Sequence, residues 1–141
     1  MPSLDRRRAK GRKEGDPFFQ LPYPVIDSAN FCKLSYAARA LLIELGRRFN
    51  GFNNGDLCAA SSTLVGRGWT SNGTITRKLR ELEYYGFIVR TRQGGLNRCS
   101  LYGLGWRPID DCHGKLDVAP TIVPIGTWKE EKPKLVGRRK S

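Results

Sequence analysis

Residues 68–106 constrain the fold more than any other part of this sequence, because a basic amphipathic helix is followed there by two strand-like runs. In GWTSNGTITRKLRELEYYGFIVRTRQGGLNRCSLYGLGW, Thr70 or Ser71 is suited to cap the helix, and Gly86 is suited to the left-handed residue that ends it. The apolar residues that recur at helical spacing, and so should face a core, are Ile75, Leu79 and Leu82.

The two strand-like runs are predicted to form an antiparallel hairpin. FIVRTRQ (87–93) and CSLYGL (99–104) are its strands, with Gly94 and Gly95 supplying positive φ angles at the turn. The alternation places Phe87 and Val89 on one side and Ile88 and Arg90 on the other, and it continues toward solvent through Thr91 and Arg92.

Two more helices are predicted upstream. Ser35 should cap a helix that ends near Asn50, whose core-facing residues are Ala38, Leu41, Leu42, Leu45 and Phe49. A shorter helix is predicted over 63–67, capped by Ser61 or Ser62, with Leu64 and Val65 turned inward. Residues 56–59 are a candidate strand that would pair with the hairpin.

Together these elements predict an α+β fold, a winged helix-turn-helix of three helices and a two- to three-stranded β-hairpin wing. Residues 1–16 are polar and basic and are predicted to be a disordered arm. The domain is expected over 17–110, beginning with an extended, proline-broken aromatic segment, and 111–141 should form an extended, partly disordered tail.

The net charge of +12 is concentrated in the part that should fold. Residues 31–106 carry eleven Lys/Arg and four Asp/Glu, and the arginines fall on the last helix and its wing. Such clustering favours a polyanionic partner over a merely soluble surface.

In a helix-turn-helix the first turns of the last helix reach base edges, and the wing contacts the neighbouring backbone. The base-contacting residues are therefore predicted to be Asn72, Thr74, Thr76 and Arg77. Arg80 should contact phosphate, Lys78 lies on the flank, and Glu81 is assigned to the outward face. On the wing, the predicted contacts are Arg90, Arg92, Asn97 and Arg98.

No enzymatic site is predicted. The four cysteines form no CxxC pair and there is one histidine, so a metal centre is not expected. The sequence also has no phosphate-binding GxxxxGK[ST] loop and no apolar run long enough for a membrane span, and no cofactor or small-molecule substrate is indicated. We expect reduced, free thiols in a bacterial cytoplasm, with Cys58 and Cys99 serving as small core residues.

Four passages, NNGDL, GRGW, RELEYYGFIVRTRQGG and LYGLGWRPID, carry a resemblance to small winged-helix proteins of bacteriophages and other mobile elements. The same region, about residues 31–110, is similar to the N-terminal DNA-binding domains of phage and plasmid replication initiators. The resemblance implies that 72–80 form the recognition helix and 90–98 the wing. The chain is too short for the second globular domain of a full initiator.

The function expected from the sequence is sequence-preferring binding of double-stranded DNA, as a transcriptional regulator or accessory replication factor of a phage or mobile element. The alternatives are a non-enzymatic winged-helix module that binds proteins, or a fragment of a replication initiator. The aromatic segment 17–31 and the apolar tail also suggest a homodimer.

Overall fold

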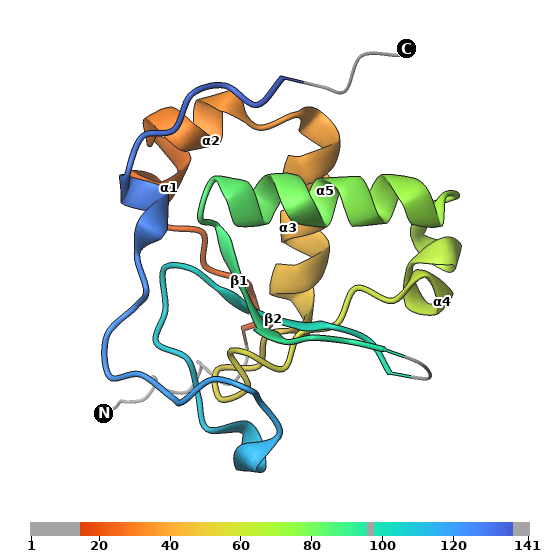
Figure 1. Ribbon diagram of the computed structural model, residues 1–141, viewed down its shortest axis with the longest axis vertical. Helices are drawn as coiled ribbons and strands as arrows, with labels where there is room; N and C mark the ends of the chain where they lie inside the picture. Colours follow the sequence, from red (N-terminus) through yellow and green to blue (C-terminus); the bar gives the residue numbers. More distant parts are fainter. Residues whose placement is uncertain (1–14, 96–97, 137–141) are drawn as a thin grey trace.

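Helix α3 (Tyr36–Arg48) crosses α5 (Asn72–Tyr84) at the centre of the computed structural model, which describes residues 15–95 and 98–136 (Figure 1). Both helices begin at the predicted serine caps. Ser35 accepts a hydrogen bond from the Ala38 N–H, and Ser71 accepts one from Thr74. Most of the predicted apolar faces are buried, namely Ala38, Leu41, Leu42, Leu45, Ile75 and Leu82, whereas Phe49 and Leu79 are partly buried. The fold mixes helices with a two-stranded antiparallel sheet.

Two short helices replace most of the predicted extended N-terminal segment. They are α1 (Tyr23–Ile26) and α2 (Ala29–Lys33). The prolines do not prevent α1, because they lie at its cap and first turn, where no helical N–H is needed. Ser28 caps α2. Residues 1–14 of the predicted basic arm lie outside the described residues.

Only some aromatic residues of this segment pack on the domain. Val25 and Phe31 are buried, and the Phe19 ring lies over Gly46 of α3 and beside Trp106. Phe18 and Tyr23 are each 81% exposed, so these two aromatic rings do not pack against the domain.

The helix predicted over 63–67 starts earlier. Helix α4 (Ser61–Leu64) begins after Ala60, which has no capping side chain, and it continues as a 3-10 turn, Val65–Arg67. The narrower turn carries Val65 outward, so Val65 is 64% exposed while Leu64 is buried. The assigned serine cap and the inward position of Val65 are therefore wrong.

Strands β1 (Ile88–Arg92) and β2 (Leu101–Leu104) form the predicted antiparallel hairpin. In the candidate strand 56–59 only Leu57 pairs with β2, through two hydrogen bonds with Tyr102. The segment is too short for a strand, because the turn at Gly55 precedes it and α4 follows at Ser61.

A register shift between Arg90 and Arg92 changes the predicted alternation in β1. Because of it, Thr91 is 1% exposed and donates a hydrogen bond to the Gly55 carbonyl. The prediction that Thr91 faces solvent is wrong. Ile88 is buried as well, so β1 does not have one solvated side at this point.

The hairpin turn also differs from the prediction. Gly95 and Arg98 pair through two backbone hydrogen bonds, so Gly95 belongs to the paired part of the hairpin, and residues 96–97 lie outside the described residues. Neither Gly94 nor Gly95 has a positive φ. At Gly94 the requirement is space, since an added Cβ would lie 2.5 Å from the Ser100 nitrogen.

Cys58 and Cys99 form a disulfide, which corrects the expectation of free thiols at these positions. The bond joins the segment before α4 to the residues that lead into β2. The free cysteines of the described chain are Cys32, which is exposed, and Cys112, which is half-buried.

Residues 111–136 follow an irregular path over the surface, with 3-10 turns at Cys112–Gly114 and Thr127–Lys129. Asp117 covers the free edge of β1 by donating its N–H to Thr91 and accepting one from Gln93. Of the apolar side chains in this segment, Trp128 is buried, whereas Ile122 is 94% exposed.

The last described part, residues 127–136, is called the C-terminal strap. It passes α1 and α2 and reaches the C-terminal end of α5 (Figure 1). The buried Asn30 amide donates to the Trp128 and Glu130 carbonyls at 2.9 Å, and its oxygen accepts the Lys132 N–H at 2.9 Å. One side chain thus fixes three successive points of the strap.

A second buried asparagine, Asn54, joins the loop before α4 to the end of β2. Its side-chain oxygen accepts the Leu104 N–H at 2.6 Å, and its amide donates to the Pro108 carbonyl at 2.9 Å. The Asp110 carboxylate accepts the Asn54 backbone N–H. These bonds satisfy backbone groups that no sheet or helix satisfies.

Asn54→Ala should lower the free energy of unfolding by about 1 to 3 kcal/mol, because buried backbone groups of Leu104 and Pro108 lose their partners. Urea denaturation followed by circular dichroism measures this loss. Asn53→Ala is the control, since Asn53 bonds at the more accessible end of α3. An equal loss in both variants would contradict the assigned role of Asn54.

Candidate nucleic-acid interface

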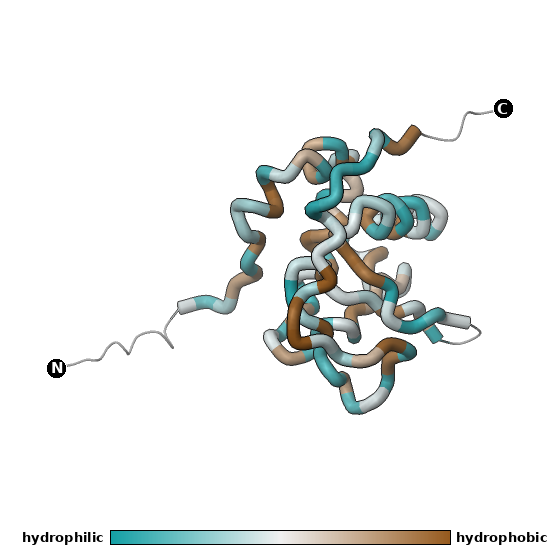
Figure 2. The backbone as a smooth tube through the Cα atoms, turned by 60° about the vertical axis from the view of Figure 1, so that its left-hand side comes forward, coloured by the Kyte–Doolittle hydropathy of each residue, from teal (hydrophilic) through white to brown (hydrophobic). Residues whose placement is uncertain are grey.

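The exposed side of α5 holds most of the predicted base-contacting residues. The exposed residues of this helix are Asn72, Gly73, Thr76, Arg77 and Arg80. Thr74 and Lys78 are half-buried. Figure 2 shows hydrophilic colour along much of this helix, in contrast to the hydrophobic segments in the interior.

Arg77 is already oriented by its own helix. Its guanidinium donates to the Thr74 hydroxyl at 3.1 Å and lies beside Gly73, where an added Cβ would be 3.4 Å from Nη1. The charge of Arg77 therefore lies over the first turn of α5. Gly73 leaves room for it there, which the sequence pattern alone did not indicate.

Glu81 does not lie on the outward face, which corrects the prediction. It is 7% exposed, and its carboxylate accepts the Ser35 N–H at 2.7 Å, the Ser35 hydroxyl at 2.9 Å and the Lys78 ammonium at 3.2 Å. Burial raises the pKa of Glu81, but the hydrogen bonds from Ser35 and Lys78 outweigh it, so the pKa lies below its ordinary value. The result is a fixed link between α5 and the start of α3.

The arginines of the hairpin differ in their surroundings. Arg90 donates to Glu83 at 3.1 Å and to Gln93 at 2.6 Å, and the Glu83 bond raises its pKa. Arg92 donates to the Cys99 carbonyl at 3.1 Å, with its Nε buried and without a partner among the described residues. It is therefore turned into the hairpin.

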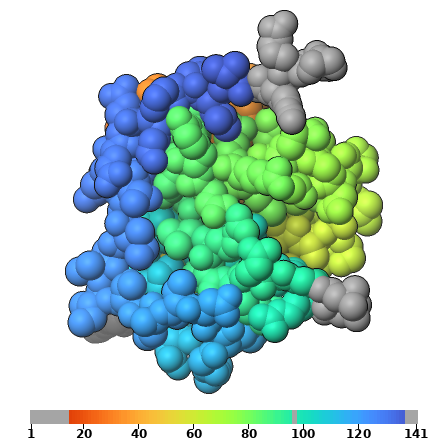
Figure 3. Space-filling view, viewed as in Figure 1, coloured from red at the N-terminus to blue at the C-terminus, as the bar shows by residue number. Residues whose placement is uncertain are grey.

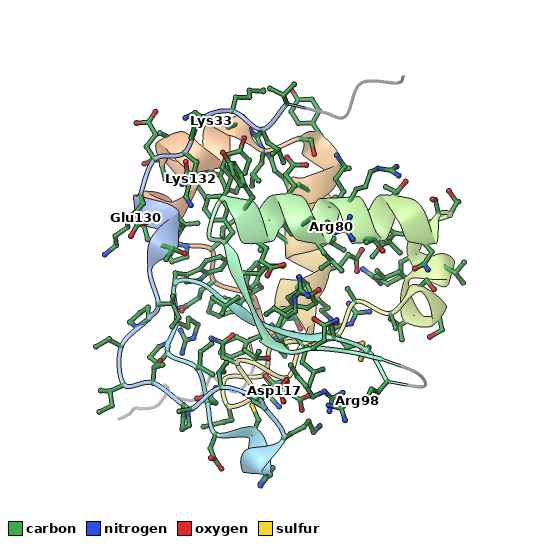
Figure 4. All side chains as sticks on the ribbon, in the orientation of Figure 1. Lys33, Arg80, Arg98, Asp117, Glu130 and Lys132 are labelled. Carbon is green, nitrogen blue, oxygen red and sulfur yellow. A yellow bond between two sulfur atoms is a disulfide. The ribbon has the colours of Figure 1, made fainter. Side chains whose placement is uncertain are left out.

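Arg98 is exposed beside the turn, at the far end of the hairpin from the core. Figure 4 shows Arg98 on the hairpin and Arg80 on α5. Asn97 lies outside the described residues, so its position stays a prediction.

A groove of about 260 Å³ separates α5 from the hairpin. Arg80 and Arg90 line it from the two sides. Its lining also includes three polar residues that were not among the predicted contacts: Gln93, Ser100 and Tyr102. Burial raises the pKa of Tyr102, with Arg90 partly opposing the shift. Gln93 belongs to the same predicted strand as Arg90 and Arg92, and Ser100 and Tyr102 belong to its partner strand, so their positions in the sequence could have identified them as groove residues.

A second groove, of about 370 Å³, lies on the other side of α5, against the C-terminal strap. Arg80 lines both grooves and therefore stands on the ridge between them. The space-filling view shows α5 between the hairpin below and the strap above and to the left (Figure 3). Lys33 and Lys134 line this groove, and no periodicity in the sequence pointed to either.

The described residues include no group of three or more His, Cys, Asp or Glu side chains that could hold a metal ion. The part of the chain that the structure describes also has no helix that is both long and apolar enough for a bilayer. Cys112, beside the single histidine, has a pKa raised by burial and by Asp56 and Asp110. A raised pKa disfavours the reactive thiolate.

Comparisons with known proteins found no match: no family model, no curated protein and no solved structure matches the sequence.

Glu81→Gln should lower the free energy of unfolding at pH 7 by about 1 to 3 kcal/mol, because the charged partner of Ser35 and Lys78 is lost. Since the folded pKa of Glu81 is lowered, its contribution is present above the ordinary carboxyl pKa and is lost as the pH falls through the folded value. Stability of the variant should therefore decline less steeply below about pH 4.

Urea denaturation between neutral and acidic pH measures this difference. Glu83→Gln is the control on the same helix, because Glu83 contacts Arg90 and is more exposed. If the two variants lose stability equally and with the same pH profile, Glu81 does not fix α5 to α3.

Proposed function

We propose that this protein binds double-stranded DNA as a winged helix-turn-helix, with α4 and α5 as the two helices and the β1–β2 hairpin as the wing. The observation that carries the proposal is the composition of the exposed side of α5. Every exposed residue of that helix is glycine, an uncharged polar residue or arginine. Both carboxylates of α5 already have partners: Glu81 accepts a hydrogen bond from Ser35, and Glu83 forms an ion pair with Arg90.

In this proposal the first half of α5 enters the major groove, which is wide enough for a helix. Asn72, Thr76 and Arg77 face the base edges there. Arginine offers two parallel donors to guanine O6 and N7, and asparagine pairs in the same way with adenine. Arg80, further along the same side, contacts a phosphate.

The wing contacts the neighbouring backbone through Arg98, which is exposed beside the turn. Arg90 contributes positive charge to the groove between wing and α5, although Glu83 and Gln93 hold its guanidinium in place. Arg92 acts mainly within the wing, because its bond to Cys99 joins the two chain segments.

The biological role proposed is that of a transcriptional regulator or accessory replication factor of a phage or mobile element. It is supported by the resemblance of residues 31–110 to winged-helix proteins of such elements. Sequence-preferring binding is what both roles require.

A protein partner is a second candidate, and one observation favours it. Four aliphatic side chains of the segment after β2 are exposed: Val118, Ile122, Val123 and Ile125. Exposed apolar groups close in sequence are typical of a protein interface. A second copy of the chain could be the partner in that interface. Analytical ultracentrifugation with and without DNA tests for a dimer.

The affinity for duplex DNA should fall steeply with salt, with log K decreasing by about 0.9 per phosphate contact for each unit of log salt. Fluorescence anisotropy at several salt concentrations measures this slope. A slope near zero would rule out the DNA proposal and favour the protein-binding module.

Arg77→Ala should weaken binding to the preferred sequence by about 1 to 3 kcal/mol and relax the preference at one base pair. Arg98→Ala should instead weaken binding to all duplex sequences by the same factor and make the slope of log K against log salt shallower. Selection of bound duplexes from a random pool, followed by titration, measures both effects.

Arg47→Ala removes the same charge from the exposed side of α3, outside both grooves, and serves as the control. Equal losses for Arg77→Ala on the preferred and on random duplexes would show that Arg77 does not read bases.

A further inference from the structure

The C-terminal strap is held beside α5 by specific hydrogen bonds. Besides the Asn30 bonds, the Tyr84 hydroxyl donates to the Pro133 carbonyl at 3.0 Å, and the Leu135 N–H donates to the Tyr85 hydroxyl at 2.6 Å. Lys33 from α2 also donates to the Lys132 carbonyl. The strap is therefore fixed from 128 to 135, directly up to the groove that it shares with α5.

This groove is strongly cationic. Its basic residues come from three separate parts of the chain, and they are Lys33, Arg77, Lys78, Arg80 and Lys134. Glu81 is the only carboxylate among the described residues that line it, and it is already bonded to Ser35 and Lys78. The lining thus carries an excess of positive charge that its own acidic residue does not neutralise.

The basic side chains of the groove differ in whether they are paired with a carboxylate. Lys33 contacts Glu131 at 3.0 Å, and Lys78 contacts Glu81 at 3.2 Å. Among the described residues, neither Arg80 nor Lys134 has a carboxylate within salt-bridge distance. Arg77 also has none, but its guanidinium is bonded to the Thr74 hydroxyl over the first turn of α5. Arg80 on α5 and Lys134 on the strap are therefore the two charges that we assign to an external anion.

We propose that the C-terminal strap is a second backbone-binding arm, placed on the opposite side of α5 from the wing, and that Lys134 contacts a DNA phosphate across this groove. The inference rests on the proposed function and adds a contact surface to it. Arg80 lies between the two grooves. DNA that is bound along α5 would therefore meet the groove beside the wing on one side of Arg80 and the groove beside the strap on the other.

The geometry explains why the strap is anchored by side chains. A mobile basic tail attracts DNA without a fixed position, whereas an arm held by Asn30, Tyr84 and Tyr85 presents its charge at one place. Ordering the arm before binding lowers the entropy that binding must offset.

The test is the salt dependence of binding to a fluorescein-labelled duplex of random sequence, for the full chain and for Lys134→Gln. Loss of one phosphate contact should make the log K against log salt slope shallower by about 0.9 and weaken binding severalfold at low salt. Lys134→Arg keeps the charge and should keep the slope.

Lys129→Gln is the matched control, because Lys129 lies on the same strap, is exposed and does not line the groove. If the unsubstituted chain binds DNA and Lys134→Gln changes the slope no more than Lys129→Gln does, the second arm is wrong while the proposed function stands. If the unsubstituted chain shows no salt-dependent binding, the proposed function and the arm are both wrong.

Discussion

The contact on which the proposed interface depends is the one between the Glu81 carboxylate and Ser35. Ser35 caps α3, and Glu81 binds both its N–H and its hydroxyl, so α5 is attached at the residue where α3 begins. The same contact removes a negative charge from the solvent side of α5. Packing and electrostatics are therefore joined in one residue: the group that fixes the angle of the helix also leaves its exposed side suitable for a polyanion.

Two buried asparagines have a corresponding role in the irregular parts of the chain. Asn54 holds the loop before α4 to the end of β2, and Asn30 holds the C-terminal strap to α2. An asparagine side chain both donates and accepts, so it can replace the hydrogen bonds that a regular element would supply. The two asparagines thus position the loop before α4 and the C-terminal strap in a small fold whose sheet has only two strands among the described residues.

Local patterns predicted the parts of this structure that depend on neighbours in the sequence. The caps at Ser35 and Ser71, the apolar face of α3 and the pairing of β1 with β2 all follow from spacing within one element or one hairpin. The site was predictable to the same extent, since the exposed residues of α5 follow from helical periodicity. The misplaced residues depend on distant partners: Glu81 on Ser35, Thr91 on Gly55, and Cys58 on Cys99. The groove beside the strap could not be predicted, because it depends on the path of a segment that has no periodicity in the sequence.

The disulfide gives these same elements a shared dependence on the surrounding redox chemistry. Cys58 and Cys99 are 41 residues apart, and the loop that they close contains α4, α5 and β1, nearly the whole proposed interface. In the chain-entropy treatment, closing a loop of that length removes unfolded-state freedom equivalent to about 4 kcal/mol at 25 °C. Where thiols are kept reduced, that constraint on the unfolded ensemble is lost, and the elements of the proposed interface must be maintained by their packing and hydrogen bonds alone.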